Sequence, residues 1–310
     1  MISLLKLIRP VNLIILAVTQ YFIDIFLLQP VFNKYGMIFT LSEFEFFLLV
    51  LSTALICGAG YIINDYFDVK ADAVNKPAKL IIGKSVTPAF AFNMYMLLTG
   101  MGIAIGIYLS IAAGNWKLVT IHVISVFLLF AYSSSFKKVP LLGNIIVALL
   151  IAVSIIMVGV FEPHLYFLAR AGDYYAADLC WHIIFSLSVF AFLLTMVREI
   201  VKDLEDMQGD KEIFARTMPI AWGINFSKAM AAFFILTTIG VAAYTLSELN
   251  SASKNIYFIL LFVLAALLMY CLVKLFSAKQ KKDYSTLSLL LKICMLTGIC
   301  FLPLYFLLEY

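Results

Sequence analysis

Two short stretches of the chain carry aspartates at the same spacing. The first holds Asp65, Asp68 and Asp72, and the second repeats the intervals of three and four residues with Asp203, Asp206 and Asp210. On a helix, such intervals place three carboxylates along one stripe. Each pair of like charges at these intervals costs roughly 0.2–0.5 kcal/mol. A positively charged partner should therefore offset each stripe.

A hard divalent cation is the partner that suits two carboxylate stripes. Mg²⁺ prefers oxygen ligands and is usually held by a few carboxylates together with substrate phosphates. Two stripes that face each other could hold a diphosphate through Mg²⁺, which would neutralise charge on that leaving group. The six aspartates are thus candidate metal ligands and candidate catalytic residues. The alternative is a solvated helical face with ordinary ion pairs, such as Lys202 with Asp206, but the repeated spacing favours the metal site.

Hydroxyl, amide and ammonium groups lie close to these stretches or at the ends of other apolar runs, namely Asn12, Lys76, Lys79, Tyr132, Ser133, Lys137 and Lys138. Hydroxyls and ammonium groups can bind phosphate oxygens. The lysines after the first triplet could pair either with its carboxylates or with the diphosphate. Asn12 lies just inside an apolar run, where an unpaired amide is costly. It therefore either serves this site or bonds to a neighbouring helix.

The elements that must position these residues are apolar runs long enough to cross a bilayer. Of the 310 residues, 64% are hydrophobic and only 13% are charged, whereas a soluble domain is roughly 45–50% apolar and about 25% charged. A membrane helix needs about 20 mostly apolar residues. Nine runs qualify, at 11–30, 42–62, 88–112, 116–133, 140–162, 180–197, 228–246, 255–273 and 286–308. They predict an all-α integral membrane protein, a single domain over residues 1–310.

Basic residues predict how these nine spans are oriented. If the N-terminus is cytoplasmic, most of the 22 Lys and Arg residues fall in inside segments, as the positive-inside rule requires. Both aspartate stretches then lie on the cytoplasmic side of a multi-pass cell-membrane protein, and the C-terminus lies outside. Lys292, within the ninth run, is expected to extend toward the cytoplasmic interface. The small net charge of +4 and the apolar composition indicate membrane lipid as the surrounding medium and give no sign of nucleic-acid binding.

Together, these motifs resemble the UbiA superfamily of intramembrane prenyltransferases. The resemblance rests on Asn-Asp-x-x-Asp-x-x-x-Asp from Asn64, on Tyr-Ser…Lys-Lys from Tyr132, on Asp-x-x-Asp-x-x-x-Asp from Asp203 and on Arg-Pro-x-Asn from Arg9. It implies a nine-helix bundle whose central cavity opens to the cytoplasm and binds Mg²⁺ and an isoprenyl diphosphate. By position, Asn64 and the six aspartates would serve the metal. The diphosphate would lie near Tyr132, Ser133, Lys137, Lys138, Arg198 and Lys202.

The second acidic stretch narrows the resemblance within the superfamily. The run from Arg198 to Lys211, followed by Thr217-Met218-Pro219-Ile220, most resembles the geranylgeranylglycerol-phosphate geranylgeranyltransferases. It implies transfer of a geranylgeranyl group to geranylgeranylglyceryl phosphate, with no obligate protein partner. An aromatic or quinone precursor is the alternative acceptor, because related motifs occur in those branches. After the first motif, Lys76 and Lys79 stand where the family often has arginines, so bidentate phosphate contacts become point contacts.

A more distant alternative is a secondary transporter. Transporters usually place polar residues at the bilayer midplane, on broken helices. Here the acidic residues gather at one end of the spans and the midplane is almost free of charge. This distribution favours the enzyme.

Overall fold

The apolar runs form helices whose starts are marked by local signals. In the computed structural model, residues 2–165, 174–248 and 254–309 are described. One long helix begins after Ser42, whose hydroxyl accepts from the Glu45 amide while the Glu45 carboxylate accepts from the Ser42 amide, which is a capping box. Another begins after Thr87, whose hydroxyl caps the helix ahead of a proline in its first turn, a position that proline favours.

The described residues form these α-helices in chain order: α1 (Ile2–Leu7), α2 (Pro10–Ile23), α3 (Gln29–Tyr35), α4 (Glu43–Phe67), α5 (Val69–Asn75), α6 (Pro88–Ala112), α7 (Val119–Ser134), α8 (Leu142–Val160), α10 (Tyr174–Glu212), α11 (Met218–Ala221), α12 (Ile224–Glu248), α13 (Lys254–Ser277), α14 (Lys281–Ile299) and α15 (Phe301–Glu309). A π-helical turn, η1 (Asp24–Leu28), joins α2 to α3, and three short 3₁₀ turns follow, η2 (Pro77–Lys79), η3 (Trp116–Leu118) and η4 (Phe136–Lys138). The ranges that the structure describes contain no named strand.

Nine of the described helical segments are long and apolar enough to cross a membrane, as predicted. Each overlaps one predicted run, and the third matches it residue for residue, at Pro88–Ala112. Several segments extend beyond the predicted ends, most of all the sixth, which covers Ala176–Glu212 where the apolar run covers 180–197. Hydropathy detects only the part that lies in lipid, and charged residues with good helix propensity continue the helix into water.

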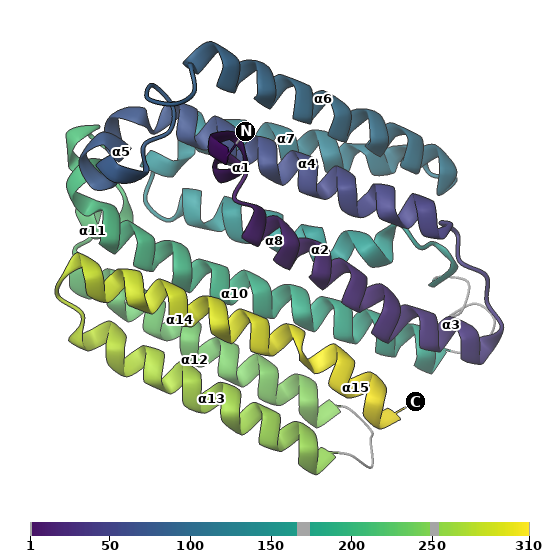
Figure 1. The fold of residues 1–310 in the computed structure, drawn as a ribbon. Coiled ribbons are helices and arrows are strands. Elements are labelled where there is room, and N and C mark those ends of the chain that lie inside the picture. The colour runs from purple at the N-terminus through teal and green to yellow at the C-terminus, as the bar shows by residue number, and fades with distance from the viewer. Residues whose placement is uncertain (1, 166–173, 249–253, 310) are drawn as a thin grey trace.

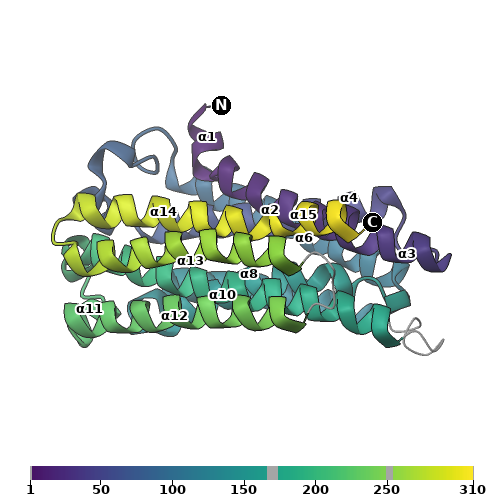
Figure 2. The ribbon, with the colours of Figure 1, turned by 90° about the horizontal axis from the view of Figure 1, so that it is seen from below.

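The helices lie side by side in one bundle, with α10 near its centre. It packs against α8, α12 and α14, while α4 packs against α6 and α7. Figure 1 shows α5, α11 and the start of α14 at one end of the bundle, and α3 and α15 at the other. The view in Figure 2 keeps α11 and α3 at opposite ends. Segments far apart in sequence therefore meet at the α5–α11 end, where both aspartate stretches lie.

Small residues allow the N-terminal helices to approach closely. A Cβ on Gly106 of α6 would stand 2.6 Å from Cγ of His122 on α7. The other side of that imidazole forms a 3.1 Å hydrogen bond with the Ser52 hydroxyl of α4. His122 is only 2% exposed, so it packs three helices together at the end remote from the aspartates.

Candidate active site

Both aspartate triplets line one cavity at the α5–α11 end of the bundle. Its volume is about 740 Å³, and its lining is mostly polar and charged. Besides the six aspartates, the lining includes Asn64 and nine cationic or hydroxyl-bearing residues, namely Lys6, Arg9, Lys76, Ser85, Tyr132, Lys137, Lys138, Lys202 and Thr217. The two triplets therefore face a common space, as their repeated spacing predicted.

The first triplet lies where one helix gives way to another. Asp65 belongs to the last turns of α4, Asp68 stands between the helices with φ −91° and ψ 2°, and Asp72 lies in α5. Backbone bonds of 3.0 Å from Asp68 N to Asn64 O and of 2.8 Å from Asp72 N to Asp68 O continue across the break. The expected single helical stripe is thus bent at its middle carboxylate, while all three side chains still reach the cavity.

The second triplet lies on the uninterrupted helix α10, and α5 is clamped against it. The Asn75 side chain donates to the backbone oxygen of Asp206 and accepts from the Gly209 amide, both at 2.9 Å. A Cβ on Gly209 would stand 2.7 Å from the backbone oxygen of Ala71. Only glycine lets α5 approach this closely, so Gly209 and Asn75 set the separation between the two triplets.

Four of the six aspartates have a cationic or amide partner from another segment. Arg9 bonds Asp65 at 2.6 Å, Lys137 bonds Asp68 at 2.5 Å and Lys76 bonds Asp206 at 2.6 Å. Asn144 of α8 donates to Asp203 at 2.9 Å. Asp210, the last aspartate of the triplet on α10, accepts a hydrogen bond from the Thr217 hydroxyl at 3.3 Å. These partners offset the repulsion among the carboxylates and fix their directions.

Electrostatic coupling shifts the pKa values of the groups outside the membrane spans. Burial, aided by the nearby Asp68 carboxylate, raises the pKa of Asp72 to about 6. Burial lowers the pKa of Lys76, but the charge and hydrogen bond of Asp206 together with the charges of Asp72 and Glu205 outweigh it, and the net shift is upward. Burial also lowers the pKa of Arg9, but the charge and hydrogen bond of Asp65 together with the nearby Tyr61 and Tyr132 outweigh it, and the net shift is upward. The cavity is therefore a strongly coupled charge system rather than a solvated surface.

The donor set fits a hard cation such as Mg²⁺. Asn64 Oδ1 and Asp206 Oδ1 are buried side-chain oxygens with no hydrogen-bond partner among the described residues, and every candidate ligand is an oxygen. In the described ranges, no three Asp, Glu, His or Cys side chains are grouped closely enough to hold a metal ion by themselves. A Mg²⁺ ion here would therefore also need water and phosphate oxygens of a ligand.

Some predicted residues do not line the cavity. Asn12 donates to the Tyr61 hydroxyl at 3.0 Å, and Ser133 bonds back to its own helix at Leu129 O. Arg198 donates to Glu199 at 3.0 Å. The side chain of Lys79 lies outside the described residues. The roles of these four residues stay predictions.

Lys202 does line the cavity, but its partner is not the one considered from the sequence. It bonds Glu199 at 2.7 Å rather than Asp206, so the ordinary helical pair between Lys202 and Asp206 is not found.

Six polar or charged lining residues are absent from the set predicted from the sequence: Lys6, Arg9, Ser85, Asn144, Glu199 and Thr217. Asn144 could have been predicted as a site residue, because a side-chain amide near the start of an apolar helix requires a hydrogen-bond partner. Arg9 begins the Arg-Pro-x-Asn motif, yet its pairing with Asp65 depends on how α2 meets α4. Glu199 is only 6% exposed, and a carboxylate buried so deeply is rare unless it is paired.

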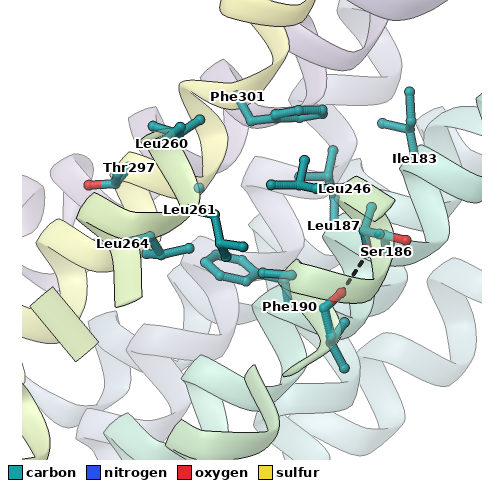
Figure 3. Close-up of a pocket in the computed structure, with 14 residues that line it drawn as sticks. Ile183, Ser186, Leu187, Phe190, Leu246, Leu260, Leu261, Leu264, Thr297 and Phe301 are labelled. Carbon is teal, nitrogen blue, oxygen red and sulfur yellow. Dashed lines mark hydrogen bonds between the residues drawn. The ribbon is translucent and has the colours of Figure 1, made fainter. Parts of the chain in front are cut away.

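A second cavity lies between the C-terminal helices, near the other end of the bundle. Its volume is about 70 Å³ and its lining is almost entirely apolar. Figure 3 shows Phe190, Leu261, Leu264 and Phe301 around this space, contributed by α10, α13 and α15. None of its lining residues carries a formal charge, so it suits a hydrocarbon group.

Known proteins share this sequence pattern and this architecture. The sequence profile of the UbiA prenyltransferase family matches residues 34–296. A digeranylgeranylglyceryl phosphate synthase from Methanothermobacter thermautotrophicus is 28% identical over 302 residues, which are 96% of this chain and 94% of the relative. A protein of the same name from Pyrococcus horikoshii is 35% identical over 183 residues, 59% of this chain and 58% of its own.

Solved structures agree with the fold. A structure of a digeranylgeranylglyceryl phosphate synthase aligns with a TM-score of 0.65 and 25% identity, over 98% of this chain and 96% of the other. A UbiA homologue from Archaeoglobus fulgidus, bound to GPP and Mg²⁺, aligns with a TM-score of 0.62 and 14% identity, over 97% of this chain and 99% of the other. The fold of this chain is thus that of these two solved proteins.

Proposed function

Because this chain belongs to the UbiA prenyltransferase family, we propose that it transfers a geranylgeranyl group from its diphosphate to geranylgeranylglyceryl phosphate. The observation that carries the proposal is the meeting of two aspartate triplets across one cavity, at the end of an otherwise apolar membrane bundle. Relatives named digeranylgeranylglyceryl phosphate synthase support this acceptor.

In this reaction the allylic C–O bond of the donor breaks, and its electron pair leaves with the diphosphate. The acceptor hydroxyl oxygen forms the new ether bond and loses its proton. Asn64 and the six aspartates would hold Mg²⁺, which when bound offsets charge on the leaving group. The ammonium groups of Lys76, Lys137 and Lys138 line the same cavity and would hold phosphate oxygens as point charges.

The apolar interior accommodates the tails of the substrates. Exposing an isoprenoid chain to water costs roughly 0.8 kcal/mol per CH₂ group, so both substrates would keep their tails among the membrane helices. The apolar cavity beside Phe190 and Phe301 is a candidate position for part of one tail. We propose that the aspartate end is cytoplasmic, because the basic residues gather in the connections at that end.

Two substitutions test the metal site. Asp68→Asn and Asp206→Asn should each lower turnover by roughly two or more orders of magnitude, because each removes a charge from a preorganised electrostatic site. Glu212→Gln is the matched control, since Glu212 is an exposed residue of the same helix as Asp206 and does not line the cavity. Transfer of label from geranylgeranyl diphosphate is measured in detergent with Mg²⁺, and thermal unfolding checks that each variant folds.

The same assay tests the acceptor. Geranylgeranylglyceryl phosphate should become labelled, while aromatic and quinone precursors should not. Near-normal turnover of both aspartate variants would remove the metal-site proposal. Labelling of an aromatic acceptor alone would replace the proposed substrate.

A further inference from the structure

A second group of charges lies beneath the aspartates, and its sign is opposite. We call it the inner basic cluster and define it as Arg9, Arg198, Lys202 and Lys292. On α10 the sign changes along one face, because Arg198, Lys202 and Asp206 follow at intervals of four residues and so lie above one another. Lys202 and Arg9 line the charged cavity, so the cluster begins where the aspartate region ends.

Two contact chains hold the cluster together. On α10, Glu199 accepts from Arg198 at 3.0 Å and from Lys202 at 2.7 Å. On the facing helices, Lys292 of α14 donates to Asn12 at 3.4 Å, and Asn12 donates to Tyr61 at 3.0 Å. The Arg9 guanidinium lies 4.6 Å from the centre of the Tyr61 ring.

The two chains meet in space. Lys292 interacts electrostatically with Arg198, Arg9 and Glu199. Lys202 likewise interacts with Arg198 and Arg9. The four cations, contributed by three separate parts of the chain, therefore lie within electrostatic range of one another.

The cluster has more positive than negative charge. Its four cations are paired with two carboxylates, Glu199 and Asp65. Arg198 Nε is a buried nitrogen with no hydrogen-bond partner among the described residues. Two positive charges in excess, close to the interior of a membrane bundle, are costly unless an anion joins them. A phosphate monoester carries about −1.5 to −2 charges at pH 7 and matches this excess.

The depth of the cluster also distinguishes it from the metal site. Lys281, at the start of α14, places its ammonium 3.9 Å from Asp206 at the outer end of the cavity. The Cα of Lys292 lies about 16 Å farther along the same helix, at 1.5 Å per residue. An anion held by Lys292 would thus lie on the apolar side of Asp206.

We propose that the inner basic cluster binds the phosphate group of the acceptor lipid, with Lys292 and Lys202 as its principal ligands. This inference rests on the proposed function, because it assumes a phosphorylated acceptor. The donor diphosphate binds at the aspartates, and the acceptor phosphate binds at a separate cationic site one helical turn or more deeper. Glu199 holds Arg198 and Lys202 in place, and Asn12 holds Lys292.

The test compares the phosphorylated acceptor with the same lipid lacking its phosphate. Lys292→Met removes the cation, Lys292→Arg retains it, and Lys282→Met removes an exposed cation from the same helix as the matched control. Equilibrium binding of labelled geranylgeranylglyceryl phosphate is measured in EDTA without donor. Steady-state transfer with Mg²⁺ then gives KM values for the donor, the phosphorylated acceptor and geranylgeranylglycerol.

Loss of one charge-assisted hydrogen bond should weaken binding of the phosphorylated acceptor by roughly 10-fold to 100-fold in Lys292→Met. The donor KM and the kinetics with geranylgeranylglycerol should not change, and Lys292→Arg and Lys282→Met should bind the phosphorylated acceptor like the unaltered protein. Lys202→Met should weaken binding of the phosphorylated acceptor in the same selective way. This second variant decides the inference if Lys292→Met does not fold.

Equal losses for both acceptors, or a rise in the donor KM alone, would overturn the inference. The latter result would assign the cluster to the diphosphate. Failure of the unaltered protein to label either acceptor would instead contradict the proposed function, and the binding measurement would still decide the inference, because it needs neither turnover nor Mg²⁺.

Discussion

Gly209→Ala should reduce prenyl transfer without unfolding the protein, because it forces the two acidic helices apart. The new Cβ would lie 2.7 Å from the backbone oxygen of Ala71, whereas ordinary contact begins at 3.4 Å. Helix α5 must therefore move by at least the difference, 0.7 Å, and the Asn75 side chain, whose Cγ would be 2.5 Å away, must leave its place. Asp72 and Lys76 would move with α5.

The expected sizes follow from opposing terms. Alanine favours the helix by about 1 kcal/mol relative to glycine, while overpacking costs about 1–3 kcal/mol and two lost hydrogen bonds cost about 0.5–1.5 kcal/mol each. The net loss of stability should be about 1–5 kcal/mol, and a folded domain is stable by about 5–15 kcal/mol, so most of this range leaves the protein folded. Catalytic groups must be held within about 0.5 Å, and a 1 Å misplacement can cost about 100-fold. We expect turnover to fall by roughly 10-fold to 100-fold.

The assay is label transfer from geranylgeranyl diphosphate at saturating Mg²⁺, alongside thermal unfolding. Gly240→Ala is the matched control, because Gly240 also lies inside a long helix but its Cβ would meet nothing within 4 Å. It should leave turnover unchanged and raise stability slightly. Turnover of Gly209→Ala within about threefold of the unaltered protein would refute the reasoning, since a displaced α5 could not then be needed for positioning.

Three further outcomes are expected. Asn144→Leu should raise the Mg²⁺ concentration needed for half-maximal turnover by about 10-fold to 100-fold, because Asp203 loses the donor that orients it; an unchanged Mg²⁺ dependence would contradict this. Lys137→Met should raise the donor KM by about 10-fold or more, and a change confined to the acceptor KM would place Lys137 elsewhere. Chelation of divalent ions by EDTA should abolish transfer, and Mg²⁺ with donor diphosphate at 100 times Kd should stabilise the fold by about 2.7 kcal/mol; an unchanged unfolding temperature would argue against a bound complex.

Local pattern predicted the elements and much of the lining of the site. Apolar run length identified nine spans, since it measures what lipid requires of a helix. The equal spacing of the two triplets predicted that Asp68 and Asp206 share one site, and both line the same cavity. Run length and triplet spacing each depend on residues close together in sequence, and the likeness of the two triplets indicated that they act together.

The pairings that position the site depend on contacts between distant segments. Nothing in the sequence around Asn75 indicates that its amide bonds Asp206 and Gly209, more than a hundred residues away. Nor does the sequence show that Lys76, rather than Lys202, pairs with Asp206. Such choices are made by helix packing, which brings a different cation closer than the neighbour on the same helix.

The length of α10 determines where in the bilayer the reaction takes place. Its 39 residues span about 58 Å, and a hydrocarbon core is about 30 Å thick. Asp203 lies six residues beyond the apolar run that ends at residue 197, or about 9 Å. The aspartate end of α10 therefore reaches the level of the lipid headgroups, where a diphosphate can be held while the hydrocarbon chain attached to it stays dissolved in the bilayer.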